Sequence, residues 1–320
     1  MDEAVSVEKL TKYYNGHLAV DNISFKVSRG EVFGFLGPNG AGKTSTIKML
    51  VGLTAPSSGT ASVAGYDILD DIIEVKQRVG VVPETSNLYD ELTVWENLLF
   101  VSRLYHVPKP ERPERIESLL ETFQLTDRRK TKFGKLSKGL KRRVVIAAAM
   151  VHQPEVIFLD EPTAGLDVMS ALSLRDYIRE LRAEDTTVLL TTHYIEEADQ
   201  LCDRIAILVK GKIATIDTSE NIKRSVRGTP VIEAFLSAEP SGKFSEEMEK
   251  HGKLELDGRR IRVETVYISE VIESLVQSAS REGLDIEEIN TLRPNLEDAF
   301  VEITGVTPET MRTEKEQGRR

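Results

Sequence analysis

Cysteine is almost absent from the sequence. Cys202 is the single cysteine in 320 residues, so no disulfide can form within the chain. This excludes the small secreted scaffolds that depend on disulfides. The start of the chain also lacks a signal-like apolar segment. Together these features predict a protein of a reducing compartment, which we expect to be the cytoplasm.

Long apolar runs are missing as well. The longest, from Val144 to Val151, has eight residues, whereas a membrane-spanning helix needs about 18. Any role at a membrane would therefore require a separate partner chain. With 40% hydrophobic and 29% charged residues, the composition suits a globular protein with one large and one smaller domain.

A surplus of positive charge is the third feature that is lacking. The formal net charge is −10 and the isoelectric point is about 5.3. Affinity for nucleic acid grows with the number of phosphates that lysine and arginine neutralise, so no nucleic-acid partner is expected. A local basic patch remains compatible with this balance.

The feature that is plainly present is a phosphate-binding loop. An apolar run at 31–36 leads into eight residues that match GxxxxGK[ST], and a helix-like segment follows. Glycines allow successive backbone N–H groups to surround phosphate oxygens, and the helix N-terminus adds its dipole. We expect a nucleoside triphosphate to bind Gly37, Pro38, Asn39, Gly40, Ala41, Gly42, Lys43, Thr44 and Ser45. Lys43 would reach the β- and γ-phosphates, and the Thr44 hydroxyl would bind Mg²⁺.

A second apolar run, at 156–159, ends in the adjacent carboxylates Asp160 and Glu161. The run predicts a parallel strand buried on both faces, and the carboxylates then form a Walker B element. Asp160 would hold Mg²⁺ through water. Glu161 would point at the γ-phosphate and act on the attacking water as the catalytic base.

A third strand is predicted at 187–192, followed by His193 and a helix. A histidine after a strand is often only a cap or a core residue. This one falls where a third loop would meet the γ-phosphate, so we expect a hydrogen bond to that group and count His193 with the catalytic residues.

Taken together, these motifs resemble the ATP-binding-cassette (ABC) ATPases, the motor subunits of ABC transporters, over about residues 5–225. Leu136-Ser137-Lys138-Gly139-Leu140 is similar to the LSGGQ signature of that family, and Ala164-Gly165-Leu166-Asp167 is similar to its D-loop. Tyr14 matches the aromatic residue that stacks on adenine, although the adjacent Tyr13 is an alternative. The resemblance implies ATP and Mg²⁺ as cofactors.

The motifs depart from the family pattern at two places. Glu84 stands where a glutamine usually touches Mg²⁺ and the catalytic water, and its carboxylate can still bind the metal. Lys138 and Leu140 replace the usual glycine and glutamine of the signature. Ser137 and Gly139 remain, and they open a helix predicted over 141–151, whose N-terminal dipole favours an anion.

The resemblance also implies partners. The signature of one subunit serves the nucleotide of the opposite subunit, so Ser137 and Gly139 would close a homodimer or a pair with another ATPase subunit around two ATP molecules. Helical spacing at 92–100 and 115–123 is similar to the helical subdomain of the family. A separate integral membrane permease would dock near there, with Tyr89, Leu92 and Trp95 as candidates for an apolar groove or as core residues.

The sequence changes character after about residue 225. Two short strands around Gly211 are predicted to close the first sheet, and the order βαββαβ then predicts a small ferredoxin-like fold with a last helix from Asn295. Its 294–300 stretch is similar to the accessory domain of drug-resistance-type exporter ATPases, and no catalytic constellation is visible in it. We expect an ABC domain at 1–228, an α+β domain at 229–305, and a disordered tail at 306–320.

These features predict an α/β P-loop NTPase of the ABC type, with antiparallel β and helical subdomains and a C-terminal α+β domain. We expect an ATPase that drives a separate permease for export, peripheral on the inner face of the cell membrane. Export is inferred from resemblance, through residues 138–143 and the final domain. A soluble ABC ATPase acting on ribosomes or nucleic acid is the alternative, and a non-catalytic cassette is disfavoured because the catalytic residues are present. The transported cargo stays open.

Overall fold

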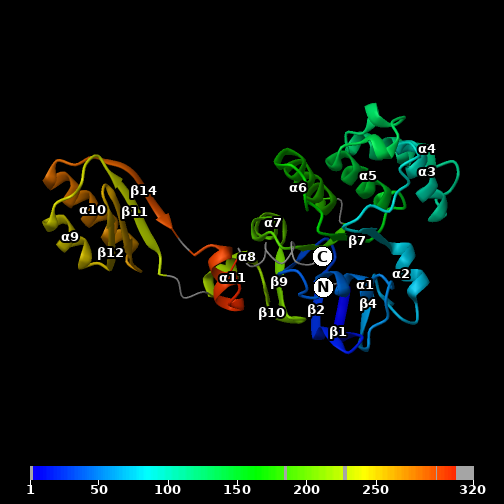
Figure 1. The fold of residues 1–320 in the computed structure, drawn as a ribbon, viewed down its shortest axis with the longest axis horizontal. Coiled ribbons are helices and arrows are strands. Elements are labelled where there is room, and N and C mark those ends of the chain that lie inside the picture. The colour runs from blue at the N-terminus through cyan, green and yellow to red at the C-terminus, as the bar shows by residue number, and fades with distance from the viewer. Residues whose placement is uncertain (1–2, 184–185, 226–228, 293, 308–320) are drawn as a thin grey trace. The chain divides into compact units, whose positions relative to one another are not determined.

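The structure is a computed structural model, and it describes residues 3–183, 186–225, 229–292 and 294–307. The chain forms two compact units. Residues 1–219 make up the first, together with the last described residues from Val306 on, and Glu220–Gly305 make up the second. Figure 1 shows the elements of each unit along the chain.

The centre of the first unit is a sheet of six strands. Five of them run parallel, and the edge strand β10 pairs antiparallel with β9. The strands β3, β7 and β8 are fully buried, as expected for apolar runs covered on both faces. In spatial order the sheet consists of β10 (Lys212–Asp217), β9 (Arg204–Val209), β3 (Val32–Leu36), β8 (Thr187–Thr192), β7 (Val156–Asp160) and β6 (Val79–Val82).

A second sheet in this unit is entirely antiparallel. Its order is β2 (His17–Ser28), β1 (Glu3–Tyr14), β4 (Ser58–Val63) and β5 (Tyr66–Asp67). The helix α1 (Lys43–Leu50) packs against strands of both sheets, and residues of the two sheets join in one apolar core. The P-loop helix is thereby fixed between the sheets. The strands predicted around the P-loop, at 156–160 and at 187–192 are confirmed.

The helical part of the first unit contains α3 (Val94–Leu104), α4 (Arg112–Thr122) and α5 (Lys138–Met150), which pack on one another. Thr93 and Glu96 form a capping box at the start of α3. Ser137 caps α5 through Leu140 N, at 3.3 Å. The remaining elements of this unit are α2 (Ile72–Arg78), the 3₁₀ turns Thr126–Arg128 and Phe133–Lys135, α6 (Val168–Ala183) and α7 (Ile195–Leu201).

The second unit has the predicted βαββαβ order. Its antiparallel sheet runs β12–β13–β11–β14, which is the ferredoxin-like arrangement. The helices α9 and α10 supply Phe244, Met248 and Leu275 to a core of their own with the sheet. The elements are α8 (Ser219–Ser225), β11 (Val231–Leu236), α9 (Gly242–Glu249), β12 (Lys253–Asp257), β13 (Arg260–Glu264), α10 (Ile268–Glu282), β14 (Ile286–Leu292) and α11 (Leu296–Thr304).

The two units divide between Ser219 and Glu220, before the predicted boundary after residue 228. The helix α8 therefore groups almost entirely with the second unit. The predicted boundary itself adjoins residues 226–228, which lie outside the described part of the chain, and so does the predicted tail from residue 308 onward.

Candidate functional site

The P-loop forms one wall of a cavity of about 290 Å³. The loop leaves the buried strand β3 and enters α1 at Lys43. Gly42 has a φ of 102°, and a Cβ there would lie 2.6 Å from the carbonyl oxygen of Ala19, so the tight turn requires glycine. The cavity is lined by His17, Ala19, Asn39, Gly40, Ala41, Gly42, Lys43, Thr44, Ser45, Glu84 and Glu161.

Lys43 lies at the centre of the loop with its ammonium group buried. Its Nζ donates to the carbonyl oxygens of Gly37 at 2.6 Å and Pro38 at 3.1 Å, and it lies 3.4 Å from Glu161 Oε1. Burial lowers the pKa of Lys43, and the neighbouring charge of Glu161 opposes that shift. The loop therefore holds a cation where phosphate oxygens would enter.

Asp160 connects the P-loop to the end of β7. Its Oδ1 accepts hydrogen bonds from Thr44 Oγ1 at 3.0 Å and from Thr191 Oγ1 at 2.6 Å. The hydroxyl of the P-loop and the carboxylate predicted to hold Mg²⁺ are thus in direct contact. Hydroxyl and carboxylate oxygens are the ligand types that Mg²⁺ takes in proteins.

Glu161 stands in a sparsely populated backbone conformation, with a φ of 49°. Its N–H is held by the Thr191 carbonyl and hydroxyl oxygens, at 3.1 and 3.0 Å. His193 Nδ1 lies 2.6 Å from Glu161 Oε2. Burial by itself raises the pKa of Glu161, but the hydrogen bond from His193 and the charge of Lys43 outweigh it and leave the pKa lowered. The carboxylate form is therefore favoured.

Arg142 is a residue of this site that the sequence reasoning missed. Its guanidinium, on α5, donates to the carbonyl oxygens of Asp160 at 2.8 Å, of Pro162 at 2.9 Å and of Pro83. Only 8% of Arg142 is exposed, and burial lowers its pKa to about 10, so it stays charged at neutral pH. One side chain thus ties α5 to the loop that carries Glu84 and to the end of β7.

His17 and Ala19 on β2 were also missed as cavity residues. They follow the turn at Asn15 and Gly16, both of which have positive φ. Alternating residues at the start of a hairpin give no chemical signal, so only the packing of β2 beside the P-loop shows this contribution.

Six predicted nucleotide residues are not among those that line the cavity of their own chain. Gly37 and Pro38 precede the lining residues of the P-loop, and their carbonyl oxygens accept hydrogen bonds from Lys43. Ser137 is exposed and caps α5, and Gly139 packs on α6, where a Cβ would lie 2.4 Å from Ser170 Oγ. Asp167 is bound to the N–H and hydroxyl of Ser170 at 3.0 and 2.7 Å. Tyr14 is 39% exposed and has Lys12 Nζ 5.0 Å from its ring centroid.

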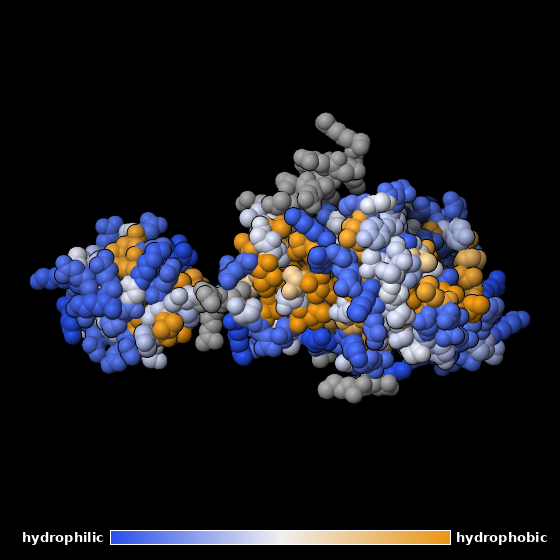
Figure 2. All heavy atoms as spheres, turned by 90° about the horizontal axis from the view of Figure 1, so that it is seen from below, coloured by the Kyte–Doolittle hydropathy of each residue, from blue (hydrophilic) through white to orange (hydrophobic). Residues whose placement is uncertain are grey.

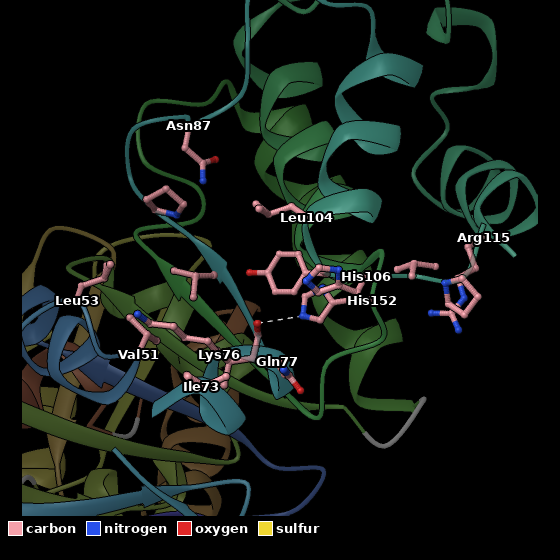
Figure 3. Close-up of a pocket in the computed structure, with 16 residues that line it drawn as sticks. Val51, Leu53, Ile73, Lys76, Gln77, Asn87, Leu104, His106, Arg115 and His152 are labelled. Atoms are coloured by element: carbon pink, nitrogen blue, oxygen red, sulfur yellow. Dashed lines mark hydrogen bonds between the residues drawn. The ribbon is translucent and has the colours of Figure 1, made fainter. Parts of the chain in front are cut away.

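A groove of about 940 Å³ lies between β6 and α2 on one side and the end of α3 on the other. Figure 3 shows Ile73 and Lys76 on one side of it and Leu104 on the other. His152 stacks on Tyr105 with ring centroids 3.7 Å apart, and its Nε2 lies 3.0 Å from the carbonyl oxygen of Val79. Apolar patches on one face of the first unit are visible in Figure 2.

The three residues predicted either for an apolar groove or for the core lie elsewhere. None of Tyr89, Leu92 and Trp95 lines this groove. The helix α3 begins only at Val94, and the side chain of Asn97 binds the carbonyl oxygens of Tyr89 and Leu92 at 3.0 and 3.4 Å. The backbone of Tyr89 and Leu92 is therefore hydrogen-bonded to the first turn of α3.

Within the described residues, no helix is long and apolar enough to cross a membrane. The family model described as ABC transporter matches residues 20–164. The chain is 36% identical over 311 residues to the linearmycin resistance ATP-binding protein LnrL of Bacillus subtilis, covering 95% of this chain and 99% of that protein. It is 37% identical over 303 residues to the Nod factor export ATP-binding protein I of Burkholderia lata, covering 94% and 97%.

Solved structures agree with these relatives. A structure titled as the ATP-binding subunit of an ABC transporter matches with a TM-score of 0.64 and 33% identity, over 69% of this chain and 92% of that one. CbiO1 of Clostridium perfringens, part of the transporter complex cbiONQ, matches with a TM-score of 0.64 and 28% identity, over 71% and 95%. The chain therefore belongs to the ABC transporter family, as an ATP-hydrolysing, ATP-binding subunit whose relatives serve resistance and export systems.

Proposed function

We propose that the P-loop cavity binds ATP with Mg²⁺ and that the side chains at its end hydrolyse the γ-phosphate bond. The observation that carries this proposal is the convergence of Lys43, Asp160 and Glu161 around the P-loop. On binding, Lys43 would exchange its carbonyl partners for oxygens of the β- and γ-phosphates. The backbone N–H groups of the loop and of the start of α1 would hold the remaining phosphate oxygens.

The oxygen atoms at the end of the cavity fit a hard divalent cation. Within the described residues, no group of three or more His, Cys, Asp or Glu side chains could hold a metal ion by itself. Thr44, Glu84 and Asp160 would therefore share Mg²⁺ with phosphate oxygens and water, Thr44 directly and Asp160 through water. When bound, Mg²⁺ would neutralise charge on the β- and γ-phosphates.

Glu161 is the proposed general base. Its carboxylate takes a proton from water as the water oxygen bonds to the γ-phosphorus. The bond to the bridging oxygen breaks, and its electron pair stays on ADP. Because the carboxylate accepts a hydrogen bond from His193, Nδ1 is the protonated nitrogen, and His193 orients Glu161 in addition to its expected contact with the γ-phosphate.

The residues that do not face their own cavity support a dimer. Ser137 is exposed at the start of α5. This exposure is what we expect of a side chain that contacts the nucleotide of a second subunit. Two ATP-binding subunits, identical or paired, would enclose two ATP molecules, each contacted by Ser137 and Gly139 of the other subunit. Asp167 would lie at the same interface, and Tyr14 would stack on adenine.

The variant Glu161→Gln tests hydrolysis and dimerisation together. In sedimentation velocity with Mg²⁺ and ATP, we expect this variant to remain a dimer with two bound ATP molecules, while the wild type returns to monomer as ATP is consumed. A variant that stays monomeric at saturating ATP contradicts the dimer. A variant that turns over ATP like the wild type removes Glu161 as the base.

The groove is the proposed docking site for a separate membrane permease. Its lining is mainly apolar, with Lys76 and Arg115 as cationic side chains. This chemistry suits a short amphipathic segment of the permease that carries an apolar face and an acidic residue. The subunit would then sit on the inner face of the membrane, and the resistance and export relatives favour export over an action on ribosomes or nucleic acid.

Binding to membrane vesicles from the source organism tests the groove. Leu104, 63% exposed, lines the groove, whereas Leu69, 49% exposed, does not. We expect Leu104→Glu to lose vesicle binding and the matched variant Leu69→Glu to keep it. Equal retention of both variants would exclude the groove as the docking site.

A further inference from the structure

A second cavity adjoins the P-loop cavity. It has a volume of about 350 Å³, and the linings of the two cavities share Glu84 and Glu161. Three cationic side chains, Lys138, Lys141 and Arg142, line the second cavity, which we call the basic cavity. A group released at the γ-phosphate end would therefore meet an excess of positive charge beyond the two carboxylates.

The three cations differ in how fully they are engaged. Arg142 is bound to three carbonyl oxygens, and Lys141 Nζ lies 3.1 Å from Asp90 Oδ1. Lys138 is exposed, and it makes no ion pair or hydrogen bond among the residues that the structure describes. Among the described residues, Lys138 is thus the cation of the basic cavity whose N–H donors have no hydrogen-bond acceptor.

Lys138 reaches across the cavity to the D-loop. A Cβ on Gly165 would lie 2.1 Å from Lys138 Nζ, so the ammonium group rests directly against this glycine. Gly165 has a φ of 67°, which also favours glycine there. The lysine that departs from the usual signature therefore has a defined place beside the loop that follows Glu161.

We propose that the basic cavity receives the inorganic phosphate cleaved from ATP, with Lys138 as the cation that binds it. The volume is on the order of ten times that of one water molecule in the liquid, which leaves room for phosphate with part of its hydration shell. The inference rests on the proposed function, because the phosphate must form beside Glu161. Phosphate would move from the P-loop cavity into the adjoining basic cavity, away from ADP.

Titration of inorganic phosphate into the full-length protein loaded with Mg²⁺ and ADP tests this site. We expect Lys138→Gln to raise the dissociation constant for phosphate about three- to fivefold, the effect of removing one exposed charge near an anion. Lys135→Gln is the matched control, since Lys135 is exposed on the same segment and does not line the basic cavity. This control is expected to bind phosphate like the wild type.

A second experiment distinguishes two possible ligands of Lys138, namely the phosphate product and the γ-phosphate of ATP bound by a second subunit. Lys138→Gln is combined with Glu161→Gln, and the ATP concentration needed for dimerisation is measured. Weaker dimerisation with unchanged phosphate binding would overturn the proposal, because Lys138 would then serve bound ATP. Absence of phosphate binding in the wild type would overturn it as well. The phosphate titration needs no turnover, so it stands apart from a failure of Glu161 as the base.

Discussion

Both units of the chain bury charged side chains, but with different partners. In the first unit, Lys43, Asp160 and Glu161 meet at the ends of β7 and the P-loop, beside a cavity. In the second unit, Glu233 lies on the sheet and is bound by Arg260 Nε and Arg262 Nε, each at 2.7 Å. The buried charges of the first unit thus adjoin a cavity, whereas that of Glu233 is bound by two guanidinium groups.

Among substitutions of the buried charges in the two units, Lys43→Met should have the largest effect on ATP binding. This change removes the cation that meets the phosphates, and we expect ATP affinity to fall about 100-fold, equivalent to ~2.7 kcal/mol. The free energy of unfolding should fall by about 1 to 3 kcal/mol, because Glu161 and the carbonyl oxygens of Gly37 and Pro38 lose their buried cationic partner. Nucleotide titration and urea unfolding measure the two quantities. A variant that keeps the wild-type ATP affinity would contradict the role of Lys43 at the phosphates.

His152 is a titratable side chain that lines the groove. Burial, with a contribution from Arg115, lowers the pKa of His152 to about 4, whereas an unfolded histidine titrates near ~6.5. Between these values the unfolded chain binds the extra proton, so stability should rise with pH across this window and the gain should be lost below pH 4.

Urea unfolding at pH 7 and pH 4.5 measures this effect. We expect His152→Gln to reduce the difference in unfolding free energy between the two pH values by about 2 kcal/mol. His106→Gln is the control, since His106 is exposed on the same groove. If both variants keep the full pH dependence of the wild type, His152 is not a source of acid sensitivity.

Arg142 sharpens the comparison within the first unit, because it neutralises no carboxylate directly and instead holds three backbone carbonyls. We expect Arg142→Met to lower ATP turnover about tenfold and to raise the Mg²⁺ concentration for half-maximal activity, as losses in the supporting shell of a metal site do. Arg143→Met, which removes a contact with the ring of Tyr177, should change neither. A fall in turnover with an unchanged Mg²⁺ requirement would argue for a purely structural role.

The smallest effect is expected in the second unit. Glu233→Gln removes the charge that Arg260 and Arg262 share, and these hydrogen bonds lower the pKa of Glu233 despite the opposing effect of desolvation. We expect a loss of about 1 kcal/mol in unfolding free energy and no change in ATP turnover. A change in turnover would show that the second unit takes part in catalysis.

Short-range patterns were sufficient for much of this molecule. The P-loop, the strands that end at Asp160 and Thr192, and the βαββαβ order could be predicted because spacing and apolar periodicity act over a few residues. The approach of Arg142 to Pro83, Asp160 and Pro162 could not, since it joins segments 18 to 59 residues apart. From the sequence alone, a basic residue near the start of α5 is expected on the surface, whereas in the structure Arg142 is buried.

The residues that line the groove could not be predicted from local sequence patterns either. Apolar spacing around Trp95 left a groove role and a core role open, and in the structure the Arg129 guanidinium lies over its ring at 4.5 Å. The groove instead joins α2, β6 and the end of α3, which are separated in the sequence. Which apolar side chains stay exposed depends on long-range packing.

The rate of ATP hydrolysis by Glu161→Gln tests the central claim most directly. Measured in a single turnover with Mg²⁺ and saturating ATP, beside Glu233→Gln, it should fall about 10²- to 10⁴-fold, the contribution of a positioned general base, while Glu233→Gln keeps the wild-type rate. An undiminished rate in Glu161→Gln would contradict the assignment of the chemistry to the carboxylate held by Lys43 and His193.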